Sequence, residues 1–252
     1  MEYTIIDRAQ DAFQQQVSLD HIWAMCQRAF GQHVSILSVR ELGGGEYNNV
    51  YLIALEGMQP VVLRVSPEPS PQDPRVKPNE VGLMRREHYM QPFLAPIATL
   101  LPKTLMIDFT HQLINRDYMF QTYMEGELWS TIEGELTWEE DLALYRQLGR
   151  ITKIIHSIEG ETFGHPLTDH TYSKWSNYVI DGLEKTIQKI EAAHLDATDM
   201  RALLDLVQAH TDLLDEVTRP KLLHGDLWTF NTLIKRGANA ATLPKITAVL
   251  DG

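Results

Sequence analysis

Cysteine and long apolar runs are what this sequence most clearly lacks. Cys26 is the only cysteine among 252 residues, so an intrachain disulfide is excluded and a reducing compartment is the default. The first residues have no signal-peptide core, and no apolar segment approaches the ~20 residues that a membrane-spanning helix needs. We therefore expect a soluble, cytoplasmic protein with no membrane partner.

Basic residues are also scarce. The 22 lysines and arginines are outnumbered by 34 acids, which gives a formal net charge of -12. Proteins that bind nucleic acid neutralise its phosphates with a basic patch, so nucleic acid is excluded as an expected partner. The histidines lack the spacing of a zinc site, and no Gly-x-Ser-x-Gly motif marks a serine nucleophile. An ordinary hydrophobic share of 44% indicates a globular protein with a sizeable core.

The first half of the chain predicts a β-rich unit. Alternating and β-branched runs predict strands, and apolar residues at helical spacing predict helices. The expected strands cover 34–42, 49–55, 61–65, 104–108 and 118–123, and the expected helices cover 18–31 and 81–94. Five prolines between 66 and 79 predict a loop in front of the second helix.

Helical patterns dominate the second half. Thr137 and Glu140 fit a capping box, in which the two side chains satisfy the first free amides of a helix. Apolar spacing extends this helix to Ile155. Two further helices are expected over 175–190 and 200–217, and a β-hairpin is inserted at 232–235 and 245–250. The second unit is therefore expected to be mostly helical.

The run from His224 to Asn231 carries the strongest chemical signal. Asp226 stands five residues before Asn231, and the predicted hairpin that follows leads to a second acid, Asp251. Phosphoryl transfer from a nucleotide uses this order: one carboxylate accepts the proton of the attacking hydroxyl, while an amide and a second carboxylate hold metal ions. The alternative is a surface turn, because glycine, aspartate and asparagine all favour turns. A turn explains these residues singly but not the hairpin and Asp251.

This arrangement resembles the catalytic loop and metal-binding aspartate of the aminoglycoside phosphotransferase-like kinases, which also include choline, fructosamine and methylthioribose kinases. The resemblance implies an α+β, two-lobed, protein-kinase-like fold. An N-terminal nucleotide-binding lobe with an antiparallel sheet and one principal helix would cover 1–123, and a mostly helical C-terminal lobe with the catalytic loop would cover 124–252. It also implies that Asp226 is catalytic, that Asn231 and Asp251 hold Mg²⁺, and that His224 anchors the loop.

Three consecutive glycines, Gly43, Gly44 and Gly45, lie between two predicted strands, where this superfamily places a loop over the phosphates. Glycine permits close backbone approach and positive φ, but an ordinary hairpin tip would use it as well. A Walker A loop is excluded because no Gly-Lys-Ser/Thr follows. A Rossmann turn is excluded because a strand follows where a helix should begin.

Arg64 occupies the strand position at which kinases place a phosphate-binding lysine, and many members of the superfamily resemble this chain in having arginine there. Either cation neutralises phosphate, although arginine presents a planar fork. Its partner is expected on the following helix, where Glu87 is the best match and Glu80 the alternative. A solvated charge on a strand is the simpler interpretation of Arg64.

The strand over 118–123 resembles the hinge that joins the two lobes in this superfamily. Adenine would bond there to the carbonyl of Thr122 and the amide of Met124. The alternative is a plain core strand.

Two aromatic residues stand inside the catalytic loop. Trp228 and Phe230 either wall the substrate pocket or pack beneath the loop, and packing is favoured for Phe230. The run His-Gly-Asp-Leu-Trp is similar to fructosamine kinases, although those usually follow the metal-binding aspartate with Pro-Ala where this chain has Gly252.

These features together predict an ATP- and Mg²⁺-dependent phosphotransferase that moves the γ-phosphate to a hydroxyl of a small molecule. The acceptor stays open among aminoglycoside-like compounds, sugars, ketoamines and amino alcohols. The alternative is a nucleotide-binding or regulatory, pseudokinase-like module, or an inactive truncated fragment. The motive for that alternative is that the sequence ends one residue after Asp251, whereas family members normally continue with helices that complete the second lobe.

Overall fold

A computed structural model describes residues 2–8, 12–43, 47–68, 82–165, 170–237, 239 and 242–250. The chain divides into two compact units, the first formed by Met1–Ile151 with Gly225–Gly252 and the second by Thr152–His224. The functional division into lobes at residues 123 and 124 stays a prediction.

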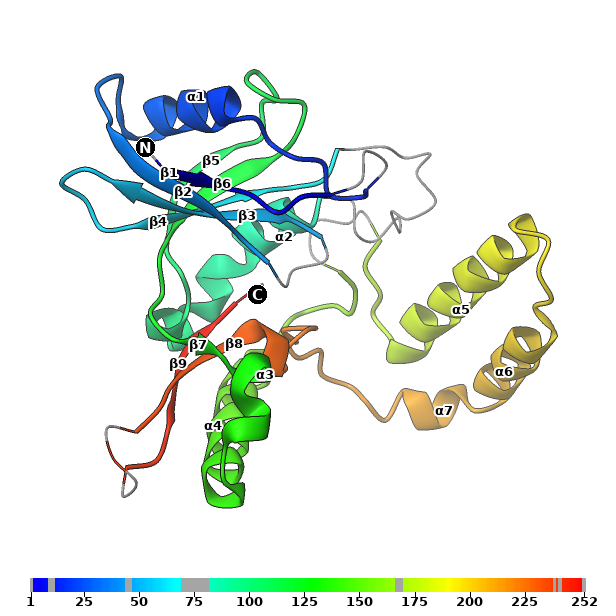
Figure 1. Cartoon of the computed structure of the whole chain (residues 1–252). Coiled ribbons are helices and arrows are strands. Elements are labelled where there is room, and N and C mark those ends of the chain that lie inside the picture. The colour runs from blue at the N-terminus through cyan, green and yellow to red at the C-terminus, as the bar shows by residue number, and fades with distance from the viewer. Residues whose placement is uncertain are drawn as a thin grey trace. The chain divides into compact units, whose positions relative to one another are not determined.

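The first unit is built on a six-stranded sheet (Figure 1). Its strands are β1 Glu2–Thr4, β2 Ile36–Leu42, β3 Asn49–Leu55, β4 Val61–Val65, β5 Thr104–Asp108 and β6 Tyr118–Thr122. Their order is β1-β2-β3-β4-β6-β5; β1 runs parallel to β2, and all other neighbours are antiparallel. The five predicted strands are confirmed within one or two residues at their ends. The edge strand β1 was missed because three residues are too few to show an alternating pattern.

One face of this sheet is covered by α1 Leu19–Phe30 (Figure 1). The helix begins where the Ser18 hydroxyl accepts a hydrogen bond from the His21 amide, at 3.2 Å. Its apolar side, with Ile22 and Cys26, packs into a core with alternate residues of the strands. Burial raises the pKa of the Cys26 thiol to about 12, so this cysteine is a packing residue.

The following helix is shorter than predicted. The segment α2 Leu83–Met90 is α-helical and begins after Gly82, whose φ is 72°. It continues as the 3₁₀ segment η1 Gln91–Leu100, which contains Pro92 and Pro96. Proline has no amide to donate to the carbonyl four residues back, so the α-helical pattern cannot continue as the sequence pattern had suggested. Most of the predicted proline-rich loop lies outside the described residues.

A second, three-stranded sheet follows the hinge segment. It consists of β7 Glu127–Leu128, β8 Thr232–Lys235 and β9 Lys245–Val249, in the order β7-β8-β9. The predicted hairpin of β8 and β9 is confirmed, and both ladders are antiparallel. The short segments β7, α3 Trp129–Ile132 and η2 Glu133–Glu135 were not predicted. Their lengths are below what a periodic pattern can reveal.

The long helix α4 Trp138–Ile155 starts with the predicted capping box. The Glu140 amide donates to the Thr137 hydroxyl at 3.3 Å, and the Thr137 amide donates to the Glu140 carboxylate at 2.9 Å. Gln147 ties the helix to the second sheet, because its side chain accepts from the Ile246 amide and donates to the Pro244 carbonyl. The hairpin of β8 and β9 is therefore tied to a capped helix.

The second unit holds α5 Trp175–Ala192, α6 Thr198–Ala209 and α7 Thr211–Leu214. The predicted helix over 200–217 is two helices, because His210 adopts φ -126° and ψ 33° and interrupts the helical backbone. Across the described residues, no helix has the length and the hydropathy to span a membrane.

Candidate active site

The catalytic-loop prediction falls on a loop whose backbone is tightly folded. Gly225 has φ 88°, a conformation that glycine adopts without strain, and the 3₁₀ turn η3 Thr229–Asn231 follows. The side-chain nitrogen of Asn231 donates to the Asp226 carboxylate at 2.7 Å and to the Asp226 backbone carbonyl at 3.0 Å. Two acceptors around one nitrogen fix the orientation of the amide, so its oxygen is the atom turned to other ligands. The structure thus brings Asp226 and Asn231 together, with the Asp226 side chain exposed.

The end of β9 returns to the same loop. The Leu250 amide donates to the Asn231 carbonyl at 2.8 Å, directly after the register pair Thr232 and Val249. Asp251 is the next residue in the sequence, and it lies outside the described residues, as does Gly252.

The donor set at this position suits Mg²⁺. An asparagine oxygen and an aspartate carboxylate are hard oxygen ligands, and Mg²⁺ commonly binds through one or two carboxylates together with phosphates and water. Within the described ranges, no group of three or more histidine, cysteine, aspartate or glutamate side chains forms a metal site. At a site formed by Asn231 and Asp251, the phosphates of a bound nucleotide and water would supply the remaining ligands.

Two aromatic rings lie within the loop. Trp228 and Phe230 stack with ring centroids 4.3 Å apart and planes inclined by 28°. Both side chains are half exposed, at 49% each. The expectation that Phe230 packs beneath the loop is therefore wrong: its ring leans on Trp228 and presents apolar surface to solvent.

Arg64 and Glu87 form the predicted ion pair. One guanidinium nitrogen of Arg64 lies 2.6 and 2.8 Å from the two carboxylate oxygens of Glu87. Arg64 is only 6% exposed, which excludes the solvated-charge interpretation. The pair lies between β4 and α2, on the sheet face opposite the α1 core. The alternative partner, Glu80, falls outside the described residues.

Gln121 is a member of this cluster that the sequence did not reveal. Its side-chain oxygen accepts from Arg64 at 3.4 Å, and its nitrogen donates to Glu87 at 3.3 Å. Gln121 is 2% exposed and comes from β6, the neighbour of β4. A polar residue in an otherwise apolar strand, next to the strand of Arg64, was the available signal.

The glycine-rich segment lies where a loop between β2 and β3 is required. Leu42 pairs with Val50 at the ends of these strands, and Gly43 follows. Gly44 and Gly45 lie outside the described residues. At the base of the loop, the buried Asn49 side chain donates to the Glu41 carboxylate at 3.0 Å, which links the two strands.

The hinge prediction falls on the end of β6. Thr122 pairs with Val61 of β4, and its amide donates to the Lys103 carbonyl at 2.9 Å. The Met124 amide makes no hydrogen bond to any part of the chain that the structure describes. Gly126 has φ 154° and lies against the second sheet. An added Cβ at this position would lie 2.6 Å from the Thr247 hydroxyl oxygen.

The described residues Gly43, Arg64, Glu87, Thr122, Met124, Asp226 and Asn231 belong to the first unit, whereas His224, the predicted loop anchor, is the last residue of the second. The Asp226 and Asn231 pair and the Arg64 and Glu87 pair are formed, whereas Gly44, Gly45 and Asp251 are not described. The roles of these residues in binding and catalysis stay predictions.

The sequence profile of the phosphotransferase enzyme family (APH) matches residues 38–251. A search of curated proteins found no match. A candidate aminoglycoside phosphotransferase from Ralstonia eutropha JMP134 is similar in structure, with TM-score 0.60 and 18% identity over 92% of this chain; this chain covers 64% of that chain.

Two ligand complexes are similar to the same degree. The streptomycin–ATP complex of APH(2")-IIa has TM-score 0.60 and 18% identity over 93% of this chain and 71% of its own. A thermostable mutant of APH(4)-Ia with AMP-PNP and hygromycin B has TM-score 0.60 and 17% identity over 91% of this chain and 70% of its own. These likenesses confirm the predicted α+β, kinase-like fold. Because the family profile spans most of the sequence, the chain belongs to the phosphotransferase enzyme family.

Proposed function

We propose that this protein is an ATP- and Mg²⁺-dependent kinase that transfers the γ-phosphate to a hydroxyl of a small molecule. The observation that carries this proposal is the set of hydrogen bonds around Asn231. Its side-chain nitrogen donates to Asp226, and its backbone carbonyl accepts from the amide of Leu250, the residue before Asp251 in the sequence. Phosphoryl transfer requires a carboxylate for the nucleophile and oxygen ligands for the metal, and Asp226, Asn231 and Asp251 are proposed for these roles.

Asp226 is the proposed base. Its carboxylate is exposed and lies on a loop held by backbone and side-chain hydrogen bonds, so it can meet an incoming hydroxyl. The acceptor oxygen attacks the γ-phosphorus as the bond between this phosphorus and the bridging oxygen of ADP breaks. The hydroxyl proton passes to the Asp226 carboxylate and from there to solvent. Asn231 holds one Asp226 oxygen, which leaves the other to accept this proton.

The metal supplies neutralisation of the charge on the phosphates when it is bound. On this chain, the Asn231 oxygen and the Asp251 carboxylate would hold it. The hydrogen bonds that fix the Asn231 nitrogen toward Asp226 therefore serve a second purpose, because they turn the oxygen of the same amide outward.

Arg64 is the proposed phosphate ligand on the nucleotide side. Glu87 orients Arg64 by binding one nitrogen of its guanidinium, and Arg64 is proposed to neutralise phosphate charge, as is expected of a cation at this strand position. Adenine is proposed to bond to the Thr122 carbonyl and the Met124 amide. An amide that makes no bond within the described chain is what such a contact needs.

The acceptor is proposed to be a small molecule with a hydroxyl, either aminoglycoside-like or a sugar, ketoamine or amino alcohol. The solved relatives hold streptomycin and hygromycin B, which supports a polyhydroxylated or amine-bearing compound. The stacked Trp228 and Phe230 rings offer a face on which such a compound can lie. The single buried cysteine fits a reducing compartment, and the proposed location is the cytoplasm.

Calorimetry with the full chain tests the proposal. Mg-ATP is expected to bind, and EDTA is expected to weaken that binding. Asp226→Asn should leave Mg-ATP affinity within about twofold and lower phosphate transfer by about 10²-fold or more, the usual worth of a general base. Asp205→Asn, an exposed acid on α6, is the matched control and should change neither quantity.

A screen of ADP release across aminoglycosides, choline, fructosamines and methylthioribose identifies the acceptor. A wild-type chain that binds no ATP in the presence of Mg²⁺ would contradict the proposed function. Tight Mg-ATP binding without any turnover across the screen would favour the regulatory module instead.

A further inference from the structure

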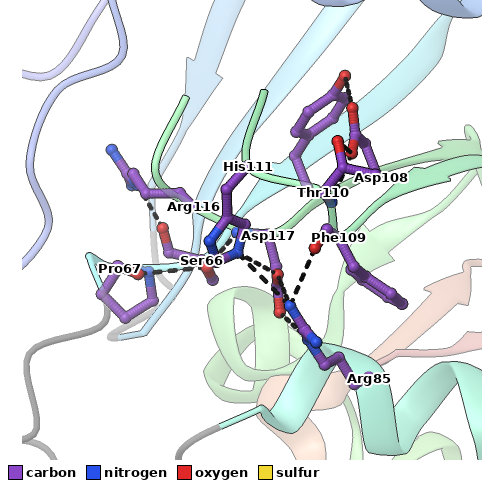
Figure 2. A network of polar contacts seen from close by, with 10 residues as sticks. Ser66, Pro67, Arg85, Asp108, Phe109, Thr110, His111, Arg116 and Asp117 are labelled. Atoms are coloured by element: carbon purple, nitrogen blue, oxygen red, sulfur yellow. Dashed lines mark hydrogen bonds and ion pairs between the residues drawn. The ribbon is translucent and has the colours of Figure 1, made fainter. Parts of the chain in front are cut away.

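The loop between β5 and β6 ends in two charged residues that are both buried. Arg116 is 2% exposed and Asp117 is 8% exposed. Figure 2 shows that their side chains reach different parts of the first unit. Charges are rarely buried unless they are fully paired, because leaving water costs several kcal/mol per ion. Their partners therefore indicate what the two residues hold.

Asp117 binds α2 through Arg85. The Arg85 guanidinium donates to both carboxylate oxygens at 2.7 Å, in the two-pronged geometry that is the strongest form of this pair. The same guanidinium donates to the Phe109 carbonyl at 3.2 Å and lies 5.0 Å from the centre of the Phe109 ring. His111, which adopts φ 60°, places its ring nitrogen 2.8 Å from Asp117. Arg85 is thus bound to the β5–β6 loop through Asp117 and Phe109 (Figure 2).

This contact determines where Glu87 lies. Arg85 and Glu87 are two residues apart on α2 and so point in different directions from the helix. Arg85 points to the β5–β6 loop, while Glu87 points to Arg64 on β4. A rotation or shift of α2 would have to break one of these pairs.

Arg116 binds the strands around the glycine loop. Its guanidinium donates to the Asn49 side chain at 2.5 Å, to the Ser66 carbonyl at 2.5 Å and to the Gln15 carbonyl at 2.8 Å. Asn49 begins β3 directly behind the glycine loop, and Ser66 follows the last residue of β4. Burial lowers the pKa of Arg116 to about 10, so the guanidinium stays charged at neutral pH.

The two contacts are joined at Ser66. The Ser66 amide donates to the Asp117 carbonyl at 2.9 Å, and the Asp117 amide donates to the Ser66 hydroxyl at 3.1 Å. One dipeptide therefore touches the base of the glycine loop, the end of the Arg64 strand and the helix of Glu87. Phosphate contacts are proposed for Arg64 and for the Gly43–Gly45 loop, and Glu87 orients Arg64.

We propose that Arg116 and Asp117 are positioning residues of the nucleotide site, which fix the start of β3 at Asn49, the end of β4 beyond Arg64 and the helix of Glu87 relative to one another for binding of the triphosphate. The proposal rests on the proposed function. Neither residue is assigned a contact with the nucleotide, and the adenine contacts proposed at Thr122 and Met124 do not involve them. Loss of the contacts should therefore weaken binding of the phosphates and leave binding of the nucleoside unchanged.

The test compares Mg-ATP with adenosine on the full chain, by calorimetry for Mg-ATP and by displacement for adenosine. Arg85→Gln and Asp117→Asn are each expected to weaken Mg-ATP binding about tenfold, within the usual range of coupling between sites. Adenosine affinity should stay within about twofold, the precision to which independent sites behave additively. The double variant should lose no more than either single variant, because both remove the same contact.

Arg28→Gln is the matched control. It breaks another arginine–aspartate pair at the other end of the same loop, where Arg28 lies 3.2 Å from Asp108, but this pair joins α1 and not the nucleotide-binding elements. Its Mg-ATP affinity should equal that of the wild type. Equal losses of Mg-ATP and adenosine affinity in Arg85→Gln, or no loss of either, would overturn the inference while wild-type binding upholds the proposed function. A wild type that binds no Mg-ATP would overturn both.

Discussion

At the scale of single residues, one amide group organises the chemistry of the loop. The side-chain nitrogen of Asn231 has two acceptors on Asp226, so the positions of the proposed metal ligand and of the proposed base depend on each other. Gln121 has the same role on the nucleotide side, because it contacts both members of the Arg64 and Glu87 pair. In each case a neutral amide sets the geometry of charged groups, and it does so without adding a charge that would need a further partner.

Trp228 is the residue at which acceptor binding can be tested separately from nucleotide binding. Its ring is half exposed two residues after Asp226 and is supported by Phe230. We expect Trp228→Ala to raise the KM for the acceptor by about fivefold to tenfold, the worth of one aromatic contact, and to leave the KM for ATP unchanged. Trp138→Ala, which removes a more exposed tryptophan from the start of α4, should change neither constant. Steady-state kinetics of both variants measure the two KM values. A change confined to the KM for ATP in Trp228→Ala would contradict the acceptor role.

At the scale of elements, the hinge depends on one glycine. Gly126 combines φ 154° with a close approach to β8, where an added Cβ would lie 2.9 Å from Leu233 Cβ and 3.0 Å from the Ile234 carbonyl oxygen. Gly126→Ala should therefore lower the free energy of unfolding by about 2–4 kcal/mol, from backbone strain and overpacking together. Gly149→Ala provides the control, since Gly149 lies within α4 and has open space at the Cβ position. That variant should gain ~0.5–1 kcal/mol, and urea titrations of both variants measure the difference.

The elements also show what the sequence can and cannot predict. The strands β2 to β6 and helix α1 follow from periodic patterns, because each has one buried face and is long enough for the period to appear. The Arg64 and Glu87 pair could be predicted from a family resemblance together with spacing. Gln121, Arg116 and Asp117 could not, because their partners come from segments distant in sequence, and only the folded strand order brings them together.

At the scale of the whole molecule, acid should weaken the sheet that carries the site. Burial raises the pKa of Asp117, but hydrogen bonds from Arg85 and His111 outweigh it, so the net pKa lies below the usual value. Burial likewise raises the pKa of Asp108, and bonds from Thr110 and Tyr118 with the charge of Arg28 lower it further than burial raises it. Because the unfolded chain binds protons first, this stability is complete above the ordinary aspartate pKa of about 3.9 and is lost as pH falls through the folded pKa values.

Asp108→Asn gives that prediction a measurable form. The urea midpoint of the wild type should fall steeply below about pH 4. Hydrogen exchange of β5 and β6 amides should show the same loss of stability in the sheet. The urea midpoint of the variant should be lower than that of the wild type at pH 7 and should fall less with acid, because one of the two titrating groups is gone. Parallel curves for the two proteins would show that Asp108 does not contribute to the acid dependence.

The two compact units should differ in stability. Among the described residues, the first unit contains most of the buried apolar side chains, including the whole core between α1 and the sheet. In the second unit, α6 has no buried residue, and Leu203, Leu206 and Leu213 of α6 and α7 are 42–59% exposed. Local opening costs less where less apolar surface is buried.

Hydrogen exchange should therefore show that protection of α6 amides is lower than that of β3 and β4 amides by about 10²-fold or more, a difference of roughly 2.7 kcal/mol in opening free energy. Mg-ATP should raise protection around Arg64 and Glu87 and leave α6 unchanged, since binding stabilises the states that hold the ligand. Equal protection of α6 and the central strands would mean that the two units open together.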